Sequence, residues 1–109
     1  AWLVVACDLP FLGDASIERL VAARGAHAIV AYRSAHDGLP EPLCAIYEPS
    51  TRVAILDAIG RDRRCPRKFV IESGVPLLDQ EDPAALDNVN TPQEFASAVA
   101  RLDAGSVPR

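Results

Sequence analysis

The stretch Trp2-Leu3-Val4-Val5-Ala6-Cys7-Asp8-Leu9-Pro10 decides the fold. Residues 2–7 are all apolar, too few for a helix and without the alternation of a half-exposed strand, so they predict a strand buried on both faces of a parallel sheet. The run stops at Asp8, and Pro10 fixes the direction in which the chain leaves. The Asp8 carboxylate is therefore expected at the carboxyl edge of the sheet, where open α/β folds bind ligands.

The segment after this loop predicts a helix and a second strand. Asp14 can cap the helix, and Gly25 suits a left-handed exit from it. Residues 28–32 then predict another buried strand, and the order strand, helix, strand implies a right-handed parallel crossover. The chain is thus expected to be α/β, with a mostly parallel sheet flanked by helices. The apolar residues at helical spacing in this first helix are Ile17, Leu20 and Val21.

The rest of the chain predicts a third strand and further helices. Residues 43–47 are expected to form the strand, and Pro49 suits the first turn of a helix that Gly60 follows. Short elements are expected at 69–72 (helix) and 75–78 (strand). The apolar face of the helix after Pro49 would consist of Val53, Leu56 and Ile59.

The last helix has the clearest local signals. Thr91 and Glu94 form a capping box, and Pro92 stands at the first helical position. A helix is therefore predicted over residues 92–103, followed by a loose tail at 105–109. Its apolar face would carry Phe95, Val99 and Leu102.

Composition excludes several classes of protein. The net charge of −4 argues against the basic face that phosphate-backbone binding needs, so no nucleic-acid partner is expected. No apolar run approaches the roughly 20 residues that cross a bilayer, so no membrane association is expected and a cytoplasmic location is predicted. The three cysteines are widely spaced and form no disulfide framework. Cys7 and Cys44 lie in strands predicted to be buried, which makes their thiols inert.

Two places could carry chemistry, and each has a second interpretation. Asp8 at a sheet edge can hold Mg²⁺ that bridges phosphate oxygens, or it can merely cap the turn that follows. Asn88 and Asn90 precede a helix N-terminus and can contact a phosphate or a pterin, or they can simply shape a loop.

Other polar residues give weaker signals. His27 and His36 have no partner at ligand spacing and are expected in surface loops. The basic cluster, defined as Arg61, Arg63, Arg64, Arg67 and Lys68, could receive a phosphorylated ligand or an acidic partner, although most charge runs form a solvated face.

Three motifs together resemble the molybdenum cofactor guanylyltransferases. They are Val4-Val5-Ala6-Cys7-Asp8-Leu9-Pro10-Phe11-Leu12, Glu41-Pro42-Leu43-Cys44-Ala45-Ile46-Tyr47 and Leu86-Asp87-Asn88-Val89-Asn90-Thr91-Pro92. The first motif is shared with many nucleotidyltransferases, whereas the other two are more selective. Their order and spacing also match, and the resemblance spans residues 2–102.

The resemblance implies transfer of GMP from GTP to molybdopterin or its molybdenum form, with release of pyrophosphate. It implies Mg²⁺ as the metal and Asp8 as its catalytic ligand. Asn88 and Asn90 would contact substrate at the active-site cleft, while Pro42, Leu43 and Tyr47 would line or support the pterin side. GTP and molybdenum cofactor are the implied substrates, and molybdoenzyme apoproteins or other cofactor-synthesis proteins are possible partners.

One part of the family pattern is missing from the sequence. Members carry a glycine-rich loop with an Arg and a Lys that holds the triphosphate, but Lys68 is the only lysine here and no such loop is present. Residues 1–104 are therefore expected to be the C-terminal half of a Rossmann-like nucleotidyltransferase domain, inactive alone. Two alternatives stay open: a non-catalytic binding module, or a related cytidylyl or sugar nucleotidyltransferase. The uncovered strand at Leu3 and Val5 predicts self-association.

Overall fold

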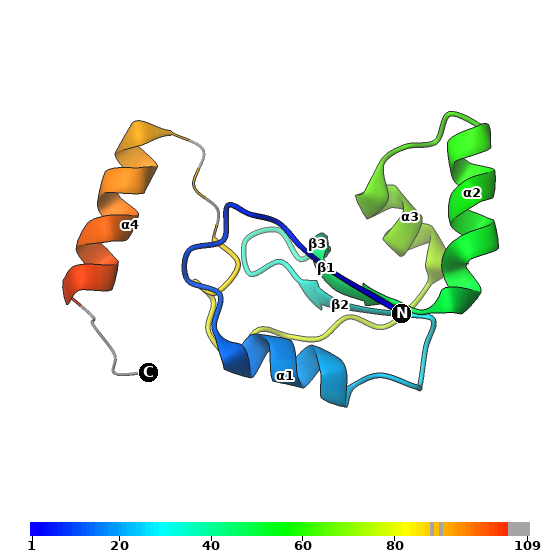
Figure 1. Cartoon of the computed structure of the whole chain (residues 1–109), viewed down its shortest axis with the longest axis horizontal. Coiled ribbons are helices and arrows are strands. Elements are labelled where there is room, and N and C mark those ends of the chain that lie inside the picture. The colour runs from blue at the N-terminus through cyan, green and yellow to red at the C-terminus, as the bar shows by residue number, and fades with distance from the viewer. Residues whose placement is uncertain (88, 90, 105–109) are drawn as a thin grey trace.

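A computed structural model describes residues 1–87, 89 and 91–104 of the chain, which form a small sheet with helices around it (Figure 1). No helix in these residues combines the length and apolar character that crossing a membrane requires. The elements in chain order are β1 (Trp2–Val5), α1 (Asp14–Ala22), β2 (Ile29–Arg33), β3 (Pro40–Tyr47), a 3₁₀ turn (Pro49–Thr51), α2 (Arg52–Gly60), α3 (Pro66–Ser73) and α4 (Pro92–Ala104).

The sheet is antiparallel in both of its strand pairings, so the expectation of a mostly parallel sheet is wrong for these strands. The strand order is β1-β3-β2, and Ala45 of β3 pairs with Val4 on one side and Ala31 on the other. The cause is the connection between β2 and β3. Only residues 34–39 join them, whereas a parallel crossover needs roughly a dozen residues or more. β1 and β2 do run in the same direction, as the predicted crossover requires, but β3 lies between them.

One parallel contact extends the sheet beyond β2. The Arg33 N–H donates to Leu78 O at 2.7 Å, and the Leu78 N–H donates to Ala31 O at 2.9 Å. These bonds form an isolated parallel bridge between Tyr32 and Leu78. The strand predicted over residues 75–78 is thus reduced to a single bridge.

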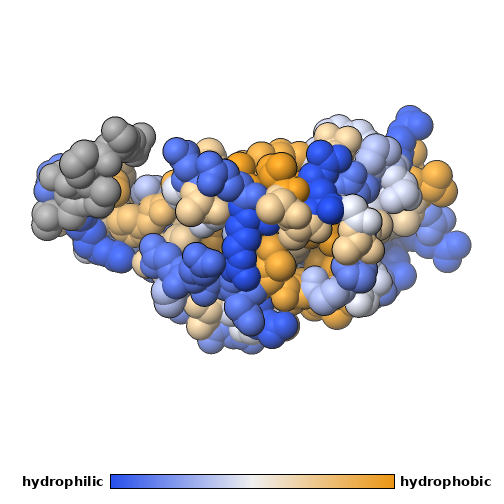
Figure 2. Space-filling view, turned by 90° about the horizontal axis from the view of Figure 1, so that it is seen from below, coloured by the Kyte–Doolittle hydropathy of each residue, from blue (hydrophilic) through white to orange (hydrophobic). Residues whose placement is uncertain are grey.

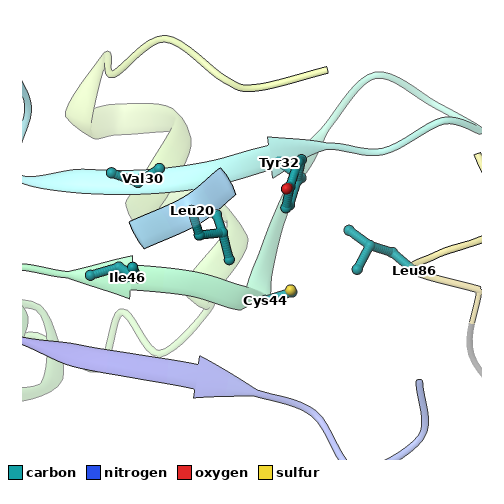
Figure 3. Close-up of a cluster of buried hydrophobic side chains, with 6 residues drawn as sticks. All are labelled: Leu20, Val30, Tyr32, Cys44, Ile46 and Leu86. Atoms are coloured by element: carbon teal, nitrogen blue, oxygen red, sulfur yellow. The ribbon is translucent and has the colours of Figure 1, made fainter. Parts of the chain in front are cut away.

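Alternating side chains of β2 and β3 build a core on each face of the sheet. On one face, Leu20 of α1 packs against Val30, Ile46 and Cys44, as Figure 3 shows. On the other face, Val70 of α3 packs against the β2 and β3 side chains that point away from α1. Leu20 is fully buried, which explains why α1 is held to the sheet. The second core consists of Ile29, Ala31, Ala45, Tyr47 and Val70.

β1 is a sheet edge: it is not buried on both faces as its apolar run predicts, but Leu3 and Val5 are uncovered, as the prediction of self-association requires. Trp2 is 50% exposed, and Leu3 and Val5 are also exposed. Cys7 is exposed as well, so the prediction that its strand buries it is wrong, whereas Cys44 is buried as predicted. Among the described residues β1 pairs with a strand on one side only, and the apolar run does not reveal this lack of cover. Figure 2 shows apolar residues at the surface in the middle of the molecule, beside a strip of hydrophilic side chains.

The predicted helices form, but two of them leave their apolar faces uncovered. Val53 of α2 is 78% exposed and Phe95 of α4 is 62% exposed. In α1, Gly13 takes the N-cap position and Asp14 is the first helical residue, so the prediction that Asp14 caps the helix is wrong. The Asp14 carboxylate instead interacts favourably with the positive end of the helix dipole. The capping box before α4 is present, because the Glu94 N–H donates to Thr91 Oγ1 at 3.1 Å.

Truncation of Leu20 should destabilise the fold more than any change on the outer face of α1. Leu20→Ala should lower the free energy of unfolding by about 2–5 kcal/mol, because it leaves a cavity between α1 and the sheet. Val21→Ala, at a half-exposed position of the same helix, is the matched control. Equal losses for the two variants in urea unfolding would contradict this packing.

The three thiols should differ in reactivity. Burial raises the pKa of the Cys44 thiol to about 11, whereas Cys7 and Cys65 are exposed. A disulfide reagent at about pH 8 should therefore modify Cys7 and Cys65 in the native protein, and Cys44 only after unfolding. In the control variant Cys65→Ser, Cys7 alone should react quickly. Rapid reaction of Cys44 in the native protein would contradict the prediction and show that solvent reaches the core around this thiol.

The uncovered edge of β1 should make the 109-residue chain associate with itself. Leu3→Lys should suppress this association, because a charged side chain on an edge strand opposes pairing with a second sheet. Sedimentation velocity over a range of concentrations measures the effect, with Val53→Lys on α2 as the control. A wild-type chain that stays monomeric at every concentration would contradict the prediction.

Candidate active site

Asp8 lies just beyond the carboxyl end of β1, as the sequence predicts. The pairing with β3 continues past the end of the strand, because the Ala6 N–H donates to Leu43 O at 2.8 Å. Asp8 follows in the adjoining turn and is half-buried. Within residues 1–87, 89 and 91–104 its carboxylate takes part in no ion pair. A half-buried carboxylate at this position is a candidate cation ligand, as the sequence predicts.

A backbone hydrogen bond joins the first and third sequence motifs. The Val89 N–H donates to Asp8 O at 3.0 Å, although the two residues are far apart in the sequence. The Asp-Leu-Pro loop thus lies directly beside the turn that leads into α4. Asn88 and Asn90, the predicted substrate contacts of that turn, lie outside the described residues, as does the tail predicted at 105–109.

Pro42, Leu43 and Tyr47 line one apolar hollow of about 560 Å³ between the sheet and helices α2 and α3. The Tyr47 hydroxyl donates to Pro42 O at 2.6 Å, and burial raises the pKa of Tyr47 to about 12. Tyr47 is therefore a neutral hydrogen-bond donor that fixes the backbone at Pro42. The side chain of Leu43 is exposed to the hollow. Other apolar residues lining it include Trp2, Val4, Ile55, Ile59 and Phe69.

A second hollow, polar and of about 600 Å³, lies between the 34–39 loop and α4. Here His36 Nε2 is 2.9 Å from Asp87 Oδ1, and this contact raises the pKa of His36. Burial raises the pKa of Glu41, which lines the same hollow. The sequence correctly predicts His36 in a surface loop but misses its partner. The charged residues of the lining are His36, Asp37, Glu41, Arg67, Asp87, Glu94 and Arg101.

The predicted site residues therefore lie in two neighbouring regions and not in a single pocket. Asp8 and Val89 meet at the end of β1, while Pro42, Leu43 and Tyr47 share the apolar hollow. The register of β1 and β3 puts Asp8 and Pro42 at the same end of the sheet. The His36–Asp87 contact has no local sequence signal, because its members come from separate segments that only the fold brings together.

Most of the basic cluster is neutralised by neighbouring acids. Arg61 pairs with Asp57 at 3.1 Å, and Arg64 pairs with Asp62 at 3.1 Å. Arg63 pairs with Glu72. These side chains are largely exposed, which is the arrangement of a solvated face rather than of an anion site.

The side chains present fit a metal ion that binds together with the phosphates of a substrate. In the part of the chain that the structure describes, no three His, Cys, Asp or Glu side chains come together to hold a metal ion. Mg²⁺ keeps most of its waters and binds through one or two carboxylates together with substrate phosphates. A single accessible carboxylate at Asp8 meets this requirement.

Residues 1–81 match the family model of the MobA-like NTP transferase domain. The chain belongs to this family of nucleotidyltransferase domains, as the three motifs predict. It is 27% identical over 111 residues to a molybdenum cofactor guanylyltransferase of Desulfosudis oleivorans, covering 95% of this chain and 54% of that protein. A molybdenum cofactor guanylyltransferase of Pseudomonas fluorescens is 30% identical over 92 residues, covering 84% of this chain and 46% of that protein.

A third relative is the molybdenum cofactor biosynthesis bifunctional protein of Synechocystis sp. It is 30% identical over 95 residues, which cover 86% of this chain and 27% of that protein. The chain thus spans about half the length of the two guanylyltransferases and about a quarter of the bifunctional protein.

Proposed function

We propose that the protein is a guanylyltransferase that moves GMP from GTP to molybdopterin or molybdenum cofactor and releases pyrophosphate. The observation that carries the proposal is the hydrogen bond between Val89 and Asp8, which joins two of the three motifs at one end of the sheet. The names of the relatives support the same substrates. A cytoplasmic location remains a prediction from the sequence.

Asp8 would hold Mg²⁺ through its carboxylate and so act as the catalytic metal ligand. When bound, Mg²⁺ would neutralise charge on the phosphates of the nucleotide. Transfer of this kind depends on alignment and charge neutralisation more than on covalent chemistry by the protein. The role of Asp8 is therefore to fix the cation relative to the end of β1.

The acceptor would lie across the neighbouring hollow. Pro42, Leu43 and Tyr47 would contact the flat pterin, because the hollow that they line is mostly apolar and Tyr47 fixes the backbone at Pro42. Asn88 and Asn90 would supply amide groups to the polar atoms or phosphate of the acceptor. No residue of this sequence is assigned to the triphosphate, since it contains no glycine-rich loop with Arg and Lys. We therefore propose that the 109 residues alone do not turn over.

Removing the Asp8 carboxylate should abolish transfer without unfolding the protein. In the complete protein, Asp8→Asn should lower kcat at least about 100-fold, because a neutral amide binds Mg²⁺ poorly. Asp14→Asn, which removes an exposed carboxylate at the start of α1, is the matched control. The assay is pyrophosphate release from GTP with molybdopterin present and with the Mg²⁺ concentration varied.

The same assay separates the proposed function from the alternatives. Consumption of CTP or of a sugar phosphate in place of GTP and molybdopterin would indicate a related transferase. A binding module would show no nucleotide consumption, and Asp8→Asn would then leave its biological role intact. Full activity of Asp8→Asn would contradict the assignment of the metal ligand.

A further inference from the structure

The loop between β2 and β3 is held rigid by its own hydrogen bonds. The Ser34 N–H donates to Leu39 O at 2.7 Å, and the Gly38 N–H donates to Ser34 O at 3.1 Å. The Leu39 N–H donates to Asp37 Oδ1 at 3.0 Å, and the His36 N–H donates to Ser34 Oγ at 3.2 Å. Gly38 has φ +73°, a conformation that glycine adopts without strain. The backbone of His36 is thus fixed relative to the sheet.

The His36 side chain leaves this loop and reaches the turn before α4. Its Nε2 lies 2.9 Å from Asp87 Oδ1, so the ring N–H donates to the carboxylate. On one side of Asp87 the chain is anchored by Leu86, which is buried in the same core as Leu20. On the other side it is anchored by the Val89 bond to Asp8. His36 therefore contacts the chain at Asp87, between the anchors at Leu86 and Val89.

The charges around His36 favour its protonated form. Asp87, followed by Asp37 and Glu41, raises the pKa of the imidazole. Arg67 of α3 and Glu94 and Arg101 of α4 line the same hollow. Because the pKa is raised, the ring is charged below its ordinary value of about 6.5, and the charge is lost as the pH rises through the raised value.

We propose that His36 is a positioning residue, which through its hydrogen bond to Asp87 holds the chain at Asp87 and Val89 against the Asp8 loop and so shapes the side of the site that binds the acceptor. This inference rests on the proposed function, because molybdopterin is taken as the acceptor. It assigns a role to a residue outside the three sequence motifs. His36 itself need not touch the acceptor.

Two measurements on the complete protein test the proposal. The first is an NMR titration of the imidazole signals, in which the His36 signal is the one that His36→Gln removes. The pKa of His36 should fall in the Asp87→Asn variant. The second is the equilibrium Kd for molybdopterin at about pH 6 and pH 8.5, which does not depend on turnover.

His36→Ala should raise the Kd at pH 6 by roughly two- to fivefold, the range that an exposed ion pair allows. His36→Gln keeps an N–H donor near the position of Nε2 and should restore tight binding at both pH values, which a loss of folding would not do. The change in Kd between pH 6 and pH 8.5 should be smaller in His36→Gln than in the wild type. His27→Gln, which changes the other exposed histidine, is the control.

The outcomes separate the inference from the proposed function. Tight, pH-dependent binding without guanylyl transfer would support the role of His36 and contradict the proposed catalysis. An unchanged Kd in His36→Ala, or an unchanged pKa in Asp87→Asn, would overturn the inference even if transfer is observed. No molybdopterin binding at either pH would overturn both.

Discussion

The antiparallel pairing of β3 with both of its neighbours is the constraint on which the rest of the structure depends. β3 lies between β1 and β2 and pairs with both, and α1 and α3 pack on its opposite faces. The pairing with β1 continues to Ala6 and Leu43, which determines where the chain turns at Asp8. The same strand carries Pro42, Leu43 and Tyr47. The central strand therefore determines both the position of the Asp8 carboxylate and one wall of the apolar hollow.

The region at the end of the sheet is held together by few interactions. Val89 reaches Asp8 through one backbone hydrogen bond, and His36 reaches Asp87 through one side-chain contact. α4 is mostly exposed beyond this turn, and Ala98 is its buried residue. Within the described residues, α4 also contacts the first loop, where Arg101 lies 4.2 Å above the ring of Phe11.

The sequence predicts individual elements better than their arrangement. Helical spacing locates α1 and α2, spacing and a capping box locate α4, and apolar runs locate the strands, because these signals are local. An apolar run does not reveal the direction of its strand. The connection of residues 34–39 is too short for a parallel crossover, and this shortness is the feature of the sequence that indicates an antiparallel pair. The apolar run alone does not predict the exposure of Trp2 and Cys7, because burial of β1 depends on what lies beside it, whereas the uncovered side chains of Leu3 and Val5 are predicted. Asp8 was located from the end of an apolar run, whereas the pairing of His36 with Asp87 required the fold.

We propose that the Asp8 loop and the chain at Val89 form one metal-dependent site. The most direct measurement is paramagnetic broadening of backbone amide signals in the complete protein, with Mn²⁺ and GTP added in place of Mg²⁺. We expect selective broadening at Asp8, Leu9 and Val89, with the signals of α2 around Ile55 unchanged, and loss of the broadening in Asp8→Asn. Broadening centred elsewhere, or broadening that persists in Asp8→Asn, would contradict it.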